Sequence, residues 1–268
     1  MGRRSLALIL LAAALTQPSP ALGGEDDEKQ YLKGDPDIPT QDLRVGKDEK
    51  KRYLLHGPRK GAKEPAGGWR IAVIAPGGSG GIDFAPFVRS VLREALTDEF
   101  LVVQPVPVKW TAEQEITWPR KLSPAPKMKF PTEEYVEDVL AEVFKARKVD
   151  RSRVFALGWS SSGPLVYDLA LREKTPFTGF YVAMSVFVTG KLPPLGNAKG
   201  RAFFLDHSKQ DETCKFFFAE KAVAELRKNE AVVELVTYEG GHGWQGDKFG
   251  RLKQGFEWLE KNRPKPAK

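Results

Sequence analysis

The chain alternates between short, continuous runs of apolar residues and longer amphipathic stretches. The apolar runs lie at residues 71–75, 100–108, 154–157, 180–188, 202–205 and 232–238. The stretches between them, at 87–96, 132–148, 164–174 and 216–229, carry apolar residues three and four positions apart. Strands without polar alternation, separated by amphipathic helices, are typical of a parallel sheet covered on both faces. We therefore predict an α/β fold.

The first part of the chain follows a different pattern. Within residues 42–55, the hydrophobic segments DLRV and RYLL flank the charged GKDEKK, which predicts a β-hairpin. Residues 1–23 place two arginines before a short apolar run and then small residues, a pattern typical of a secretory signal peptide. We expect residues 24–40 to be a flexible leader, 41–263 a single domain and 264–268 a tail. The expected location is secreted or periplasmic, without stable membrane insertion after the signal is cleaved.

Composition and charge change this picture little. The 268 residues carry a formal net charge of +7, but Lys and Arg are interspersed with Asp and Glu. No Arg-rich stripe interleaved with aromatic residues occurs, so the basic balance indicates a solvated surface and no nucleic-acid partner. Because Cys214 is the single cysteine, the chain has no internal disulfide.

Chemistry-bearing segments follow four of the apolar runs. Ligands of open parallel sheets bind beyond the carboxyl ends of the strands, so these loops are where a site is expected. The segments are PGGSGG, GWSSSG, DHSKQDE and EGGHGW. They bring a glycine-rich backbone, a serine turn, carboxylates and a histidine to one edge of the predicted sheet.

The serine turn offers a candidate nucleophile. A serine becomes nucleophilic when a neighbouring base removes its proton, and a sharp strand-to-helix turn exposes its oxygen. Such a turn requires small residues two positions before and after the serine. Ser160 has Gly158 and Ser162 at these positions, whereas Ser161 would place Trp159 in the tight turn. We therefore predict Ser160 as the nucleophile; the alternative is that the serines only cap the following helix.

A histidine and a carboxylate complete the candidate set. Imidazole accepts a proton near neutral pH, and the glycines around His242 allow it to reach a neighbouring strand end. His56 falls in the hairpin and is expected to be structural, and His207 is expected to orient its own loop. The carboxylate that fixes the histidine tautomer is predicted to be Asp211, with Asp206 as its competitor.

The glycine-rich segment PGGSGG, residues 76–81, has two interpretations. As a phosphate-binding loop it lacks both the Lys-Ser/Thr of a P-loop and a G-x-G-x-x-G spacing. In a serine hydrolase, its backbone N–H groups would stabilise the negative charge on the substrate oxygen. We predict that this oxyanion hole is formed by the N–H groups of Gly78 and Ser161.

The order Ser160, Asp211, His242 on successive strand ends resembles the α/β-hydrolase superfamily. Within it, the chain is similar to the small branch of phospholipase/carboxylesterase, dienelactone-hydrolase and feruloyl-esterase-like enzymes. The short separation of acid and histidine leaves no room for a large lid. The resemblance covers about residues 42–258.

Two motifs carry the resemblance, with small departures. GWSSSG is similar to the G-x-S-x-G-G of that branch, with Ser162 in place of a glycine. HSKQD, residues 207–211, is similar to H-G-x-x-D, with Ser208 in place of the glycine. Pro76 stands where the branch often has a histidine that braces the oxyanion loop.

The resemblance implies a fold and an activity. The fold would be an α/β-hydrolase fold with a mostly parallel central sheet, helices on both faces and no large lid. The activity would be that of a carboxylesterase-like serine hydrolase that cleaves a small-molecule or oligomeric ester through an acyl-enzyme intermediate. It implies no metal and no cofactor. The alternatives are a peptidase or amidase of the same fold and a catalytically silent binding module.

A polar, proline-containing insertion at residues 109–130 follows the apolar run 100–108. We predict that Trp118, within the insertion, and Trp159, beside the nucleophile, bind substrate. Arg120 or Lys121 would then meet a carboxylate of the substrate. The alternative is a loop that packs its own tryptophans onto the domain.

Overall fold

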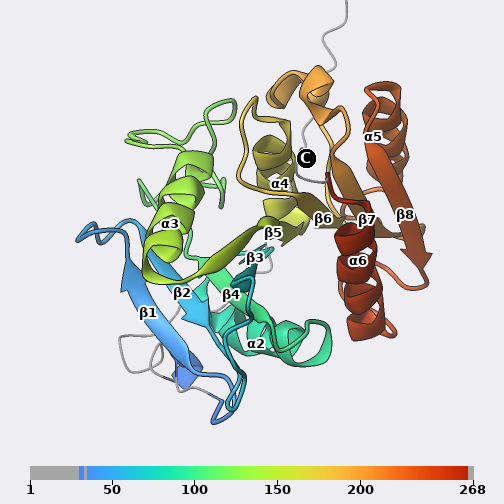
Figure 1. The fold of residues 1–268 in the computed structure, drawn as a ribbon. Coiled ribbons are helices and arrows are strands. Elements are labelled where there is room, and N and C mark those ends of the chain that lie inside the picture. Colours follow the sequence, from blue (N-terminus) through green and yellow to red (C-terminus); the bar gives the residue numbers. More distant parts are fainter. Residues whose placement is uncertain (1–29, 33–34, 265–268) are drawn as a thin grey trace, which may run out of the picture.

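A computed structural model describes residues 30–32 and 35–264. The predicted signal peptide and residues 265–268 of the predicted tail lie outside this range. The described part contains an eight-stranded sheet in the order β1-β2-β4-β3-β5-β6-β7-β8 (Figure 1). The strands are β1 (Thr40–Arg44), β2 (Arg52–His56), β3 (Trp69–Ala75), β4 (Phe100–Pro105), β5 (Val149–Trp159), β6 (Gly179–Ala183), β7 (Ala202–Ser208) and β8 (Val232–Tyr238).

The sheet is antiparallel at one edge and parallel elsewhere. β2 pairs antiparallel with both β1 and β4, and the β1–β2 pair is the hairpin predicted from the sequence. The remaining neighbours, from β4 across to β8, pair in parallel. The carboxyl ends of the six parallel strands, β3 to β8, therefore lie at the same end of the sheet. The loops that carry the candidate site residues follow these strand ends.

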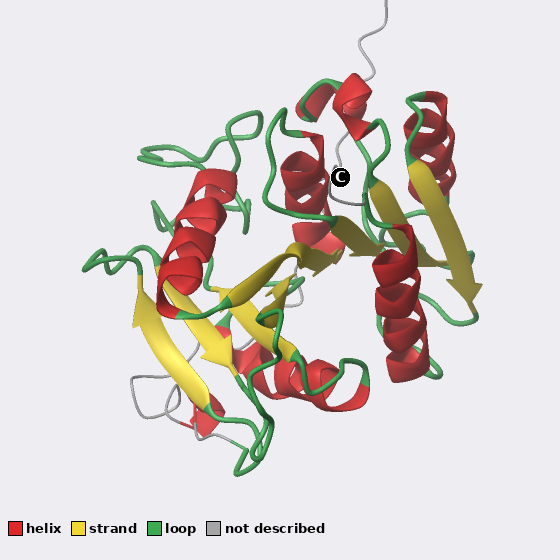
Figure 2. Cartoon of the chain, in the orientation of Figure 1, coloured by secondary structure: helices red, strands yellow, loops and turns green. Residues whose placement is uncertain are grey.

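Helices cover both faces of the sheet, as predicted (Figure 2). They are α2 (Ala85–Glu94), α3 (Thr132–Ala146), α4 (Gly163–Leu171), α5 (Phe217–Lys228) and α6 (Lys248–Asn262). α3, α4 and α5 share one apolar cluster with alternate strand residues such as Ile71 and Val73. α2 and α6 share a second cluster with the intervening residues, such as Ala72 and Ile74, because side chains alternate between the faces of a strand. The predicted α/β class and its mostly parallel sheet are confirmed.

The helix α6 is absent from the elements that the apolar pattern predicts. Its interior holds Gly250 and Gly255, and glycine inside a helix costs about 1 kcal/mol relative to alanine, which weakens the helical signal. The structure explains Gly255: a Cβ at this position would overlap the Tyr181 ring of β6. The glycine therefore allows α6 to approach the sheet closely.

Ordered structure begins earlier than the predicted domain boundary at residue 41. Ile38 is fully buried against the α2 face of the sheet. Arg89 of α2 donates a hydrogen bond from Nη1 to the Tyr31 carbonyl at 3.0 Å. The described residues Tyr31 and Ile38 of segment 24–40 thus contact the domain, while residues 24–29 and 33–34 of this segment lie outside the described range, and the flexible leader stays a prediction.

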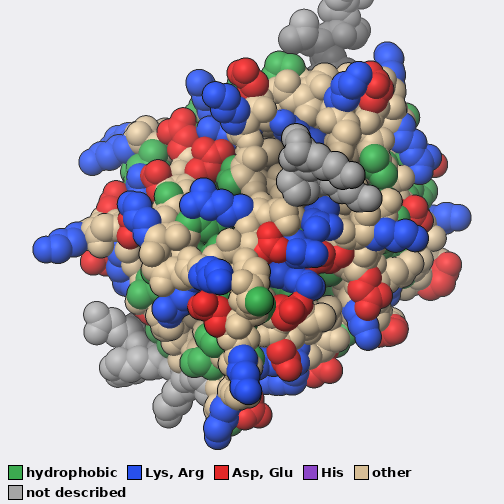
Figure 3. Space-filling view, in the orientation of Figure 1, with side chains coloured by type: hydrophobic (Ala, Val, Ile, Leu, Met, Phe, Trp, Pro, Cys, Tyr) green, Lys and Arg blue, Asp and Glu red, His purple; other side chains and the backbone are tan. Residues whose placement is uncertain are grey.

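Among the described residues, none of the helices has both the length and the apolar character needed to cross a bilayer. On the face shown in Figure 3, Lys and Arg side chains are interspersed with Asp and Glu.

His56 is buried in the hairpin. Its Nδ1 lies 2.9 Å from Thr40 Oγ1, and its Nε2 lies 3.2 Å from Gln104 Oε1. Burial lowers the pKa of His56 to about 3. The imidazole is therefore neutral in the folded protein and has a structural place, as the sequence predicted.

We expect His56 to make stability fall in mild acid. The unfolded chain protonates this imidazole near pH 6.5, whereas the folded chain excludes the proton down to about pH 3. The contribution is fully present above pH 6.5 and is lost as the pH falls between these values, by about 2 kcal/mol at pH 5. Urea unfolding at pH 7.5 and pH 5 measures it. The difference should shrink in His56→Gln, and an unchanged difference would contradict this role.

Candidate active site

The chain turns sharply from β5 into α4 at Ser160, which has a positive φ of 53°. Non-glycine residues rarely adopt this conformation, and its presence here marks a strained turn. A Cβ at Gly158 would lie 2.7 Å from a side chain of α4, and one at Gly163 would overlap Ser185. Ser185 Oγ also donates a hydrogen bond to the Ser160 carbonyl at 2.6 Å. Glycines on both sides thus permit the turn that presents Ser160.

Ser162 occupies the position where a glycine was expected, and its hydroxyl is used in the turn. Oγ donates to the Ala75 carbonyl at the end of β3, at 2.6 Å, and accepts from the Trp159 N–H at 2.8 Å. The side chain is fully buried. Ser162 therefore ties the turn to the neighbouring strand, which leaves Ser160 as the serine that faces His242.

Three side chains from separate strand ends form one hydrogen-bonded chain. Ser160 Oγ lies 3.0 Å from His242 Nε2, and His242 Nδ1 lies 2.8 Å from Asp211 Oδ2. An ionised carboxylate can only accept, so Nδ1 carries the proton and Nε2 is free to accept from the Ser160 hydroxyl. The structure brings together the three residues that the sequence singled out.

Asp211 is held in its ionised form. Its burial raises the pKa, but hydrogen bonds from His207, His242 and the Cys214 N–H outweigh burial and hold the pKa well below its usual range. Oδ1 accepts from the N–H groups of Thr213 and Cys214 at 2.9 and 2.8 Å. This set of donors fixes the carboxylate and leaves Oδ2 directed at His242.

Asp206, the competing acid, lies elsewhere. It is fully buried, and it accepts hydrogen bonds from the Tyr181 hydroxyl at 3.0 Å and from Arg251 Nε at 3.1 Å. Burial raises the pKa of Asp206, and Arg251 lowers it in part. Asp206 therefore links α6 to the sheet, and the geometry favours Asp211 as the partner of His242.

The loop that carries His242 is anchored on both sides. The Tyr238 hydroxyl donates to the Gly243 carbonyl at 2.8 Å, and the Gly240 N–H donates to Gln210 Oε1 at 2.7 Å. Since Gln210 directly precedes Asp211, these contacts fix the histidine loop against the loop of the acid.

Comparison with solved structures identifies the architecture. The structure superposes on that of a thermostable esterase with a TM-score of 0.62 and 16% identity, over 85% of this chain and 64% of the other. Fungal esterases from Rhizomucor miehei give 0.63 and 15%, over 87% and 85%, and the Bacillus cereus carboxylesterase gives 0.55 and 17%, over 88% and 99%. The protein has the α/β-hydrolase fold. No protein-family model and no curated protein sequence matches the chain.

In this α/β-hydrolase fold, the two tryptophans predicted to bind substrate are both buried in the packing around the site. Trp159 is 5% exposed, and its ring lies edge-on to the rings of Phe84, Phe87 and Trp244. Trp118 is 2% exposed and lies beneath the glycine-rich loop. Both indoles are therefore largely covered by neighbouring side chains and backbone, and their contact with substrate stays a prediction.

The insertion after β4 packs onto the domain, in agreement with the second interpretation of its tryptophans. Arg120 is buried, pairs with Asp168 of α4 at 3.1 Å and donates to the Lys191 carbonyl at 3.0 Å. The guanidinium thus anchors the insertion and is not free for a substrate carboxylate. Lys121 is exposed at the surface of this segment.

Cys214 lies beside the predicted nucleophile, a place that sequence reasoning did not anticipate. Burial raises the pKa of its thiol to about 12, the Asp211 charge adds to this, and a hydrogen bond with Ser160 opposes it. The thiol is therefore neutral. No motif or spacing marks Cys214 or Ser185 as neighbours of Ser160, because both contacts depend on how the loops close.

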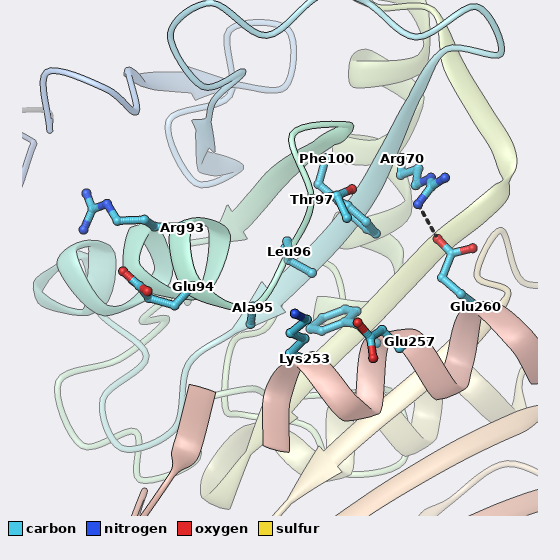
Figure 4. A pocket seen from close by; sticks show the side chains of 11 residues that line it. Arg70, Arg93, Glu94, Ala95, Leu96, Thr97, Phe100, Lys253, Glu257 and Glu260 are labelled. Atoms are coloured by element: carbon cyan, nitrogen blue, oxygen red, sulfur yellow. Dashed lines mark ion pairs between the residues drawn. The ribbon is translucent and has the colours of Figure 1, made fainter. Parts of the chain in front are cut away.

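A hollow of about 480 Å³ between the end of α2 and α6 lies away from this site (Figure 4). It is lined by Arg70 and Phe100 at the amino ends of β3 and β4, and Arg70 pairs there with Glu260 at 3.4 Å. Ser160 follows the carboxyl end of β5, so it lies at the opposite end of the parallel strands. This hollow is therefore separate from the candidate active site.

Proposed function

We propose that the protein is a serine hydrolase that cleaves carboxylic esters through an acyl-enzyme intermediate. One observation carries the proposal: the continuous chain from Ser160 Oγ through the His242 imidazole to Asp211, at 3.0 and 2.8 Å. A hydroxyl, a base and an orienting acid in this order are what nucleophilic acyl transfer requires.

Each residue has a defined role in the proposed reaction. His242 Nε2 takes the proton from Ser160 Oγ as this oxygen attacks the ester carbonyl. Asp211 keeps the proton on Nδ1 and stabilises the imidazolium that forms. The N–H groups of Gly78 and Ser161 hold the developing oxyanion. His242 then protonates the leaving alcohol, and it later activates the water that releases the acid.

The preference for an ester substrate and the location of the protein rest on observations other than the hydrogen-bonded chain. The similar structures include a thermostable esterase and a carboxylesterase, which favours an ester over an amide as the substrate. The composition of residues 1–23 supports export to a secreted or periplasmic location. The competing functions remain a peptidase or amidase and a silent binding module.

Substrate pairs with the same acyl group test the ester preference. We expect the mature protein to hydrolyse p-nitrophenyl acetate and butyrate, with kcat/KM at least about tenfold above that for the matching p-nitroanilides, because an anilide is the less reactive carbonyl compound. Release of p-nitrophenol or p-nitroaniline is followed by absorbance. Faster anilide cleavage would favour the amidase, and cleavage of neither would favour the binding module.

A further inference from the structure

In the glycine-rich loop after β3, residues 76–81, three consecutive backbone carbonyls accept hydrogen bonds. Trp118 Nε1 donates to the Pro76 carbonyl at 3.0 Å. The Gly80 N–H donates to the Gly77 carbonyl at 2.9 Å. The Gly77 carbonyl and the Gly78 N–H belong to the same planar peptide, so a donor on the first fixes the direction of the second.

The next carbonyl in this loop receives two donors. Thr117 Oγ1 donates to the Gly78 carbonyl at 2.8 Å, and Ser161 Oγ donates to the same oxygen at 2.9 Å. One hydroxyl comes from the insertion after β4 and the other from the serine turn. The oxygen of Gly78 is therefore the point where the insertion, the glycine-rich loop and the turn are joined.

These contacts hold a backbone that has little rigidity of its own. Gly78 has a φ of +57° and Gly80 a φ of +68°, and glycine moves among such conformations more freely than other residues. The Trp118 ring lies directly beneath Gly80, where an added Cβ would come within 2.7 Å of it. A loop of this composition requires external donors to keep one conformation.

The insertion that supplies two of the donors is firmly attached. Arg120, two residues beyond Trp118, is buried between Asp168 and the Lys191 carbonyl. The Thr132 hydroxyl donates to the Pro119 carbonyl at 2.7 Å. The segment around Thr117 is thus a fixed part of the domain and can serve as a reference for the glycine-rich loop.

We propose that Thr117 and Trp118 are positioning residues for the oxyanion hole, an inference that rests on the proposed function. Their hydrogen bonds to the carbonyls on either side of the Gly77–Gly78 peptide hold the Gly78 N–H toward the reacting oxygen. Since this N–H is used most strongly when charge develops, its alignment acts on kcat rather than on KM.

Replacing the Thr117 hydroxyl tests this role. Thr117→Val keeps the shape of the side chain but removes the donor, and we expect kcat for p-nitrophenyl butyrate to fall about tenfold with KM changed less than about twofold. Thr117→Ser restores the hydroxyl and should recover most of the rate. Thr111→Val, the same exchange in the same insertion, is the matched control and should leave kcat unchanged.

A second measurement separates failure of this positioning by Thr117 and Trp118, the brace, from failure of the proposed function. Hydrogen–deuterium exchange of residues 76–81 is expected to be faster in Thr117→Val than in wild type and in Thr111→Val, whether or not an ester is cleaved. Faster exchange with an inactive wild type would overturn the proposed function and the catalytic role of the brace with it. Unchanged exchange, or equal kcat values in Thr117→Val and wild type, would overturn the brace itself.

Discussion

Asp211→Asn is expected to lower kcat for ester hydrolysis by about 10⁴-fold, while Asp206→Asn leaves kcat within about threefold of wild type. Only Asp211 accepts from His242 Nδ1, at 2.8 Å. An amide in its place can present N–H to the ring, which would shift the ring proton to Nε2 and leave no acceptor for the Ser160 hydroxyl. Steady-state kinetics of the two variants provides the comparison.

The matched variant separates catalysis from stability. Asp206→Asn leaves Arg251 without its carboxylate partner, so we expect it to lower the free energy of unfolding by about 1–3 kcal/mol. Urea unfolding measures this loss. If Asp206→Asn abolished hydrolysis in a folded protein while Asp211→Asn retained it, the assignment of the acid would be reversed.

Ser160→Ala and His242→Ala are each expected to lower kcat by at least about 10⁴-fold, and the double variant no further than either single variant. The reason is that the hydroxyl and the imidazole act as one unit across the 3.0 Å contact. Ser161→Ala keeps the backbone N–H proposed for the oxyanion hole but loses one of the two donors to the Gly78 carbonyl, so we expect it to stay active with kcat lowered by no more than about tenfold. The rates of hydrolysis of p-nitrophenyl butyrate provide the measurement, with circular dichroism to show that each variant is folded.

Multiplicative losses in the double variant would contradict this coupling. They would mean that Ser160 and His242 contribute independently, for example as binding residues. A fully active Ser160→Ala variant would exclude the serine as the nucleophile.

The fold class and the main candidate residues could be predicted because both depend on local signals. Continuous apolar runs marked the parallel strands, and the small residues Gly158 and Ser162 marked the sharp turn at Ser160. Loops at the carboxyl ends of parallel strands meet at one edge, which is why residues distant in sequence, such as Ser160 and His242, could be paired in advance.

The remaining features depend on long-range packing. Asp206 and Asp211 lie close together in the sequence. Only their contacts in the folded chain, Asp206 with Arg251 and Asp211 with His242, distinguish them. Trp118 appeared suited to a substrate pocket, but its burial beneath the glycine-rich loop depends on the path of the whole insertion. Thr117 carries no motif at all, so its contact with the Gly78 carbonyl could not be anticipated.

The most direct test of the central claim is the intact mass of the protein after treatment with a fluorophosphonate. Such a reagent labels a serine that is activated by a neighbouring base. We predict one adduct on wild type, none on Ser160→Ala, and one each on Ser161→Ala and Ser162→Ala. An adduct that persists in Ser160→Ala, or folded wild-type protein that forms none, would contradict it.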